Sequence, residues 1–130
     1  MFDIEAQVRV PDGGPRRAVV ADGDHGQRAR IAGHLAACGF LVSEATDGYE
    51  ALSMIGSEAP LVALIPRGDA DDDGVRAAAL ANMLYPHTRI ILTVSAPDGV
   101  DDDGPFLVLK RPVDLSMLDR CLSEIVAAAR

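Results

Sequence analysis

Few side chains of this chain are spaced for chemistry. The acidic run Asp69 to Asp73, followed by Gly74, lacks the terminal Glu of a calcium-binding loop, and a second run spans Asp98 to Asp103. The histidines and cysteines show no metal-ligand spacing: His25, His34, His87, Cys38 and Cys121. The sequence has no nucleophile paired with a base and no glycine-rich phosphate loop. It therefore predicts a protein that is not an enzyme.

A second group of residues stands at the ends of predicted strands. Asp22 follows the first strand, Pro66 the third, and Arg111 the fifth, while Thr93 lies at the end of the fourth. In an open parallel sheet the ligand crevice lies beyond the carboxyl ends of the strands. Carboxylate, hydroxyl and guanidinium groups there could bind a cation or an oxyanion, whereas proline offers neither a carboxylate nor a backbone N–H.

These positions depend on an alternation of strands and helices. Short apolar runs predict strands over residues 18–21, 40–45, 61–65, 89–94 and 106–110. Helical spacing predicts helices over residues 26–38, from a cap at Asp47, over 74–84 and over 115–129. Strands that are apolar throughout and alternate with helices predict an α/β fold, with a doubly wound five-stranded parallel sheet covered on both faces.

Side-chain patterns give finer expectations for the helices. Asp47 and Glu50 form a capping box at the start of the second helix. The third helix should bury Val75, Ala78, Ala79 and Met83, and the last helix the stripe Leu115, Leu118, Leu122, Ile125 and Val126. Arg28 and Arg30 are expected on the outer face of the first helix.

Two segments depart from this regular order. Residues 1–10 alternate apolar and polar side chains, and Pro11 to Pro15 form a turn, so residues 1–15 are either a loose extension or an extra edge strand. The main domain is then residues 16–130. Between the fourth and fifth strands, Ser95 to Pro105 are rich in Pro, Gly and Asp. This composition predicts a loop or a single turn in place of a fourth helix.

The composition limits the classes of function. A chain of 130 residues with 48% hydrophobic residues supports one domain with a substantial core. The net charge of −8 argues against a nucleic-acid surface. No apolar run is long enough for a bilayer and no secretory signal is evident, which predicts a cytoplasmic protein with reduced, packed cysteines. A disulfide between Cys38 and Cys121 is left open.

Spaced motifs carry a resemblance to a known family. The segment from Gly39 to Leu52 and the motif Arg111-Pro112-Val113-Asp114 resemble the second strand and helix, and the Lys-Pro-Phe-Asp turn, of bacterial response-regulator receiver domains. The resemblance covers residues 16–130. It implies the flavodoxin-like fold of the chemotaxis regulator, with strand order 2-1-3-4-5, and a cis bond before Pro112. Thr93 matches the family's Ser or Thr after the fourth strand.

The same resemblance reveals departures at the family's phosphorylation site. Pro66 stands where receivers carry the phosphoacceptor aspartate, and Gly23, between Asp22 and Asp24, replaces one of two metal-binding acids. Arg111 replaces the phosphate-binding lysine, and Val108 a switch aromatic. The resemblance therefore implies a degenerate pocket of Asp22, Gly23, Asp24, Pro66, Thr93 and Arg111. In this pocket Asp22 is expected to pair with Arg111 or cap the first helix, Thr93 to serve as a strand residue, and magnesium binding to be lost or weak.

Three functions follow as expectations. The leading one is a stand-alone, non-phosphorylatable pseudo-receiver: an adaptor in two-component phosphorelay signalling that binds a histidine kinase or another regulator, with homodimerisation left open. The alternative is a small-ligand or cyclic-dinucleotide sensor that uses Arg67 and Arg111 in the crevice, with the Arg16-Arg17 pair as further candidate residues. A shifted phosphoacceptor, Asp69 or Asp24, is the least favoured because phosphoryl transfer needs an aimed carboxylate.

Overall fold

A computed structural model describes residues 16–67, 73–95 and 106–128. Its sheet contains five parallel strands: β2 (Arg17–Ala21), β3 (Leu41–Ala45), β4 (Val62–Pro66), β5 (Arg89–Ser95) and β6 (Leu107–Arg111). Their spatial order is β3-β2-β4-β5-β6, which confirms the expected order 2-1-3-4-5. The extension over residues 1–15 and the loop expected between β5 and β6 lie outside the described residues.

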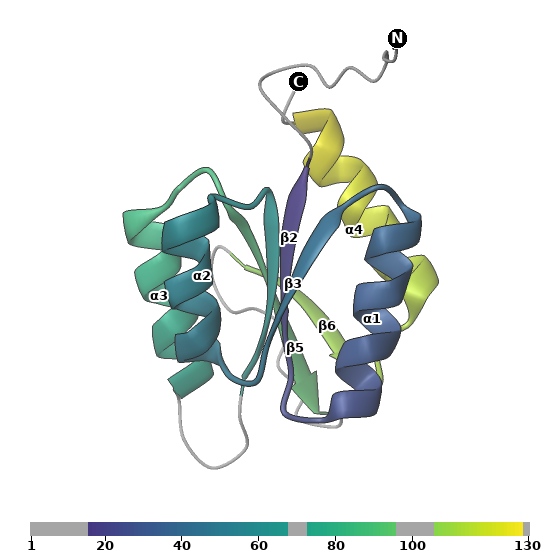
Figure 1. The fold of residues 1–130 in the computed structure, drawn as a ribbon, viewed down its shortest axis with the longest axis horizontal. Helices are drawn as coiled ribbons and strands as arrows, with labels where there is room; N and C mark the ends of the chain where they lie inside the picture. The colour runs from purple at the N-terminus through teal and green to yellow at the C-terminus, as the bar shows by residue number, and fades with distance from the viewer. Residues whose placement is uncertain (1–15, 68–72, 96–105, 129–130) are drawn as a thin grey trace, which may run out of the picture.

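Helices cover both faces of this sheet. α1 (His25–Ala37) and α4 (Leu115–Ala128) lie on one face, and α2 (Gly48–Glu58) and α3 (Asp73–Leu84) lie on the other (Figure 1). The carboxyl ends of the strands point to the bottom of the view, where β2 leads into α1. No helix in the described part of the chain has the length and hydropathy needed to cross a bilayer.

The cores on the two faces of the sheet differ in the size of their side chains. On the side of α1 and α4 the core is built from large aliphatic side chains, among them Leu35, Leu64, Ile91, Leu118 and Ile125. On the side of α2 and α3, alanines contribute much of the core: Ala21, Ala45, Ala51, Ala63, Ala78 and Ala81. The central strands are buried on both faces, which explains why their sequences are apolar throughout.

Small residues allow α2 and α3 to pack closely. A Cβ added to Gly48 would lie 3.1 Å from the Cβ of Ala77 and 3.3 Å from the Cα of Gly74. At the other end of α2, a Cβ on Gly56 would meet the Tyr85 hydroxyl at 2.7 Å. Gly48 is therefore favoured by the close approach of the two helices rather than by backbone conformation, whereas at Gly56 the nearest atom is the end of the Tyr85 side chain, which can rotate away.

This close packing corrects the inner positions expected for α3. The helix buries Gly74, Ala77, Ala78 and Ala81, whereas Ala79 is exposed and the Met83 side chain is 69% exposed. Ala78 was correct and Val75 is half-buried, but Ala79 and Met83 were wrong. The physical reason is that α3 turns its small residues toward α2 and the sheet. A pattern search that favours large apolar side chains selects a different face.

The helix caps largely follow the sequence pattern. The Asp47 carboxylate accepts a hydrogen bond from the Glu50 N–H at 2.8 Å, which confirms the predicted cap of α2. Glu50 in turn accepts from the Thr46 N–H at 2.7 Å, one residue before the position expected for a capping box. The stripe on α4 is also confirmed, because Leu118, Leu122 and Ile125 are buried.

Candidate functional site

Asp22 is the buried acid at the carboxyl edge of the sheet. It follows β2 directly and is 3% exposed. Its backbone N–H donates to the Ala45 carbonyl at 3.0 Å, which ties it to the end of β3. One carboxylate oxygen, Oδ1, accepts from the Asp24 N–H at 2.8 Å. A carboxylate held in this way points over the strand ends, where the ligand crevice of this fold class lies.

Arg111 reaches Asp22 from the far edge of the sheet. Its Nη1 lies 3.9 Å from Oδ2 of Asp22, and its Nη2 donates to the Ser95 hydroxyl at 2.9 Å. β6 is the edge strand, so the arginine side chain spans the ends of β5 and β4 to reach the residue after β2. The expected pairing of Asp22 with Arg111 is therefore present, as a long ion pair.

The N-cap residue of α1 is Asp24, whereas Asp22 was the expected candidate for this role. Oδ2 of Asp24 accepts from the Gln27 N–H at 3.3 Å, so Asp24 and not Asp22 is the N-cap residue. The geometry explains this, because Asp22 is still bonded to β3 through its N–H. Gly23, between them, is exposed, and a Cβ there would approach only the Thr46 carbonyl oxygen, at 3.8 Å. A larger side chain would fit at this position.

Pro66 ends the central strand, β4. It pairs in register with Thr93 of β5, and the next residue, Arg67, donates its N–H to the Thr93 carbonyl at 2.9 Å. Because main-chain groups alternate sides along a parallel strand, the Pro66 nitrogen faces β2. The β2–β4 ladder stops earlier, at Val20 and Leu64. A residue without an N–H is accommodated at this point because the ladder has already ended.

Thr93 presents a buried hydroxyl beside Pro66. The residue is 2% exposed, and its Oγ1 has no hydrogen-bond partner among the residues described. Buried hydroxyl groups in native proteins usually have a partner. Thr93 therefore differs from Thr88, whose buried hydroxyl donates to the Pro60 carbonyl at 2.6 Å.

Arg28 is part of the site's rim, which the sequence did not indicate. Its Nη1 donates to the Asp22 carbonyl at 2.8 Å, and its Nε pairs with Glu44 at 2.9 Å. Its Nη2 lies 2.9 Å from Nδ1 of His25. The side chain is only 15% exposed, so its expected place on the outer face of α1 was wrong. It folds back because the Asp22 carbonyl and Glu44 both accept hydrogen bonds there.

The remaining expectations concern β6 and the turn that follows it. The Arg111–Pro112 peptide bond is cis, as the resemblance implies. Val108 pairs with Leu92 and packs against the alanine-rich core, half-buried. The site therefore joins Asp22, Pro66, Thr93 and Arg111 at one edge of the sheet, with Arg67 adjacent in the chain.

Comparison with solved structures identifies the fold. The chain is similar to the signal receiver domain of an HD domain-containing protein from Pseudomonas fluorescens Pf-5, with a TM-score of 0.77, 18% identity and 94% of each chain covered. It is also similar to a CheY-like receiver domain from Methylobacillus flagellatus, with a TM-score of 0.74, 15% identity, and 86% and 99% of the two chains covered.

A third similar structure is the receiver domain of the putative response regulator NarL from Mycobacterium tuberculosis. It has a TM-score of 0.69 and 23% identity, and the match covers 88% of this chain and 98% of that one. No family model matches the sequence, and no curated protein matches it. The chain thus has the receiver fold of two-component response regulators.

Proposed function

We propose that this protein is a pseudo-receiver: a signalling module that is not phosphorylated and acts by binding another protein of a two-component pathway. The observation that carries this proposal is Pro66 at the carboxyl end of the central strand, in register with Thr93. A proline ring has no oxygen that could accept a phosphoryl group, so the position cannot perform the covalent step.

The donor set at the strand ends also does not fit a magnesium cage. Magnesium requires near-octahedral oxygen ligands at about 2.0–2.1 Å. Of the nearby positions, Gly23 and Pro66 supply no side-chain oxygen, while Oδ1 of Asp22 already accepts from Asp24. The Arg111 guanidinium, 3.9 Å from Oδ2, places a positive charge where a cation would sit. Magnesium binding at this edge is therefore expected to be weak or lost.

An exposed apolar surface on α3 supports a role in association. Leu80, Met83 and Leu84 are 37%, 69% and 56% exposed, and their spacing places them on one side of the helix. Clustered exposed apolar side chains are more typical of interaction surfaces than of inert ones. The partner proposed is a histidine kinase or another regulator of the pathway.

A phosphorylation assay tests this proposal. The full chain is incubated with acetyl phosphate and Mg²⁺ and its intact mass is measured. The unmodified mass is expected to persist. The control is the double variant Gly23→Asp with Pro66→Asp, which introduces a carboxylate at each position. At Gly23 there is room for a side chain. A wild-type mass with no phosphoryl adduct supports the proposal. A phosphorylated aspartate at Asp22, Asp24 or Asp69 would refute it.

A second candidate function rests on the Thr93 hydroxyl. This buried group has no partner among the described residues, and it lies at the same sheet edge as Arg111. A small oxyanion or a cyclic dinucleotide phosphate could accept hydrogen bonds from both. Calorimetry with inorganic phosphate and a cyclic-dinucleotide panel separates the two functions. Binding that is weakened in Arg111→Ala favours the sensor, and absence of binding favours the adaptor.

A further inference from the structure

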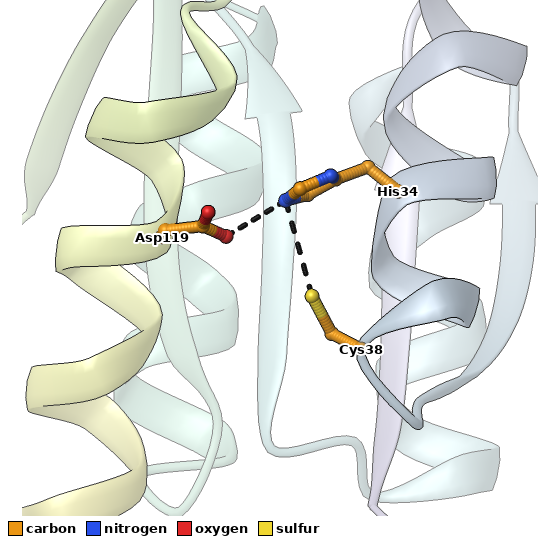
Figure 2. A group of neighbouring side chains, drawn as sticks. All are labelled: His34, Cys38 and Asp119. Atoms are coloured by element: carbon orange, nitrogen blue, oxygen red, sulfur yellow. Dashed lines mark hydrogen bonds and ion pairs between the residues drawn. The ribbon is translucent and has the colours of Figure 1, made fainter.

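Three side chains with metal-binding atoms meet on the outer surface between α1 and α4. His34 and Cys38 come from the last turn of α1 and its C-cap, and Asp119 comes from α4 (Figure 2). Nε2 of His34 lies 2.7 Å from Oδ1 of Asp119 and 3.9 Å from Sγ of Cys38. All three ligand atoms lie within 4.8 Å of one another. This cluster uses none of the residues of the sheet-edge site.

The cluster also changes the description of Cys38. The sequence predicted a packed thiol, but Cys38 is exposed, whereas Cys121 is half-buried. Cys38 ends α1, where its N–H donates to the His34 carbonyl at 3.1 Å, and the helix geometry then brings the two side chains to the same side. The expectation that these residues show no metal-ligand spacing took no account of the four-residue interval between His34 and Cys38, and nothing in the sequence links Asp119, 85 residues from His34, to that pair.

The contacts are not those of a catalytic Cys-His-Asp relay. In such a relay the base uses one ring nitrogen for the nucleophile and the other for the acid that orients it. Here both Asp119 and Cys38 approach the same nitrogen, Nε2. One nitrogen cannot donate to the carboxylate and accept from the thiol at the same time. Three atoms that can each bind a metal and that lie within 4.8 Å of one another are instead a candidate ligand set.

We propose that His34, Cys38 and Asp119 bind a divalent cation of the zinc class. Imidazole nitrogen, thiolate sulfur and carboxylate oxygen are all zinc ligands, at about 2.0–2.1, 2.3 and 2.0–2.2 Å. A tetrahedral ion with these bond lengths separates its ligand atoms by about 3.3–3.6 Å. The distances of 2.7 and 3.9 Å lie on either side of that range and all three atoms lie within 4.8 Å, so the side chains would rotate by a small amount to bind the ion.

Metal binding would replace the hydrogen bond between His34 Nε2 and Asp119 by bonds from both residues to the ion. The Nε2 lone pair must face the ion, so the ring proton moves to Nδ1, and the Cys38 thiol releases its proton. The side chains of His34 and Asp119 are 23% and 52% exposed, so solvent reaches the cluster and water would supply the remaining ligand. The ion would connect α1 to α4, next to the hydrogen bond that Arg30 Nη2 makes to the Val113 carbonyl at 2.7 Å.

Calorimetric titration of the reduced full chain with zinc chloride tests the proposal. Excess Mg²⁺ is included so that sites made only of carboxylates are occupied. Binding of one zinc per chain is expected. Replacement of a ligand in His34→Ala, Cys38→Ser or Asp119→Asn should weaken the affinity by about tenfold or more, because even outer-shell partners of metal sites contribute about 10- to 100-fold. Circular dichroism of each variant establishes that it is folded.

Cobalt(II) provides a readout that is specific for the sulfur ligand. The wild type should show a thiolate-to-cobalt charge-transfer absorption, Cys38→Ser should lack it, and the matched variant Cys121→Ser should retain it. Loss of the absorption in Cys121→Ser, equal zinc affinity in wild type and Cys38→Ser, or no zinc binding by the wild type would each overturn the proposal.

Discussion

The Cα of Gly74, in the first turn of α3, lies directly against the carbonyl oxygen of Pro66. A Cβ built on Gly74 would stand 1.9 Å from that oxygen and 3.0 Å from the Cα of Arg67. Both neighbours are backbone atoms at the end of β4, so they cannot rotate away as a side chain would. Gly74 is therefore required by the approach of α3 to the strand that ends in Pro66.

Gly74→Ala is expected to destabilise the fold by about 2–3 kcal/mol or more, because the added methyl group forces the backbone of α3 away from β4. Urea unfolding followed by circular dichroism measures the change. Gly33→Ala is the matched control, since Gly33 is exposed within α1 and a Cβ there meets nothing within 4 Å. It should stabilise the protein by about 0.5–1 kcal/mol. Equal effects of the two variants would contradict the close contact.

Arg111→Ala should cost about 1–3 kcal/mol of stability, because it removes the guanidinium that lies 3.9 Å from the buried Asp22 carboxylate. Lys110→Ala, which removes an exposed cation from the adjacent position of β6, is the control and should change stability by less than about 0.5 kcal/mol. The measurement is the midpoint and slope of denaturant unfolding. A loss in Arg111→Ala no greater than that in Lys110→Ala would mean that the long ion pair contributes nothing.

The two thiols should react with iodoacetamide at different rates. Burial, followed by the nearby negative charge of Glu124, raises the pKa of the Cys121 thiol above its ordinary value. Since the thiolate is the nucleophile, Cys121 should be alkylated slowly at neutral pH, and its rate should still be rising where an ordinary thiol has reached its plateau. The exposed Cys38 should react first, as peptide mapping after timed quenching would reveal.

Glu124→Gln is the variant that examines the smaller of these two causes. It removes the charge that disfavours the Cys121 thiolate, so the rate at Cys121 should increase while the rate at Cys38 stays constant. If Cys121 is alkylated before Cys38 in the wild type, the burial assigned to it is wrong.

Asp114 should contribute to stability in a defined pH window. Its pKa is lowered, chiefly by the Ser116 hydroxyl, which donates to the carboxylate at 2.7 Å, and also by the Ser116 N–H at 2.9 Å. A carboxyl group with a lower pKa in the folded state stabilises the fold fully above its unfolded value. That contribution is lost as the pH falls through the folded value. Ser116→Ala should raise the Asp114 pKa, measured by NMR titration of the side-chain carboxyl carbon. An unchanged titration would exclude the hydroxyl as the main cause.

Much of the sheet-edge site could be predicted because strand ends are marked in the sequence. Asp22, Pro66, Thr93 and Arg111 each stand at the end of an apolar run, and parallel topology then brings those ends to one edge. Their local contacts were harder to predict. Which of Asp22 and Asp24 caps α1 depends on whether β2 continues to pair with β3 for one more residue, and that is a tertiary effect.

The parts that could not be predicted depend on how helices are rotated about their axes. α3 buries alanines and exposes Met83 because α2 approaches it closely, and no pattern within α3 alone specifies that approach. The contact of His34 with Asp119 likewise requires the relative positions of α1 and α4. Periodicity determines which residues share a helix face, but packing determines which face is turned inward.

The glycine and alanine contacts between α2 and α3 have a mechanical consequence. At Gly48 the contact with Ala77 involves only a methyl group and backbone, neither of which can change rotamer. A protein that pulls on the outer side of α3 would therefore shift α2 as well, and with it the start of that helix beside the sheet edge. We therefore expect α2 and α3 to move together, so that a displacement of α3 near Met83 also reaches the start of α2.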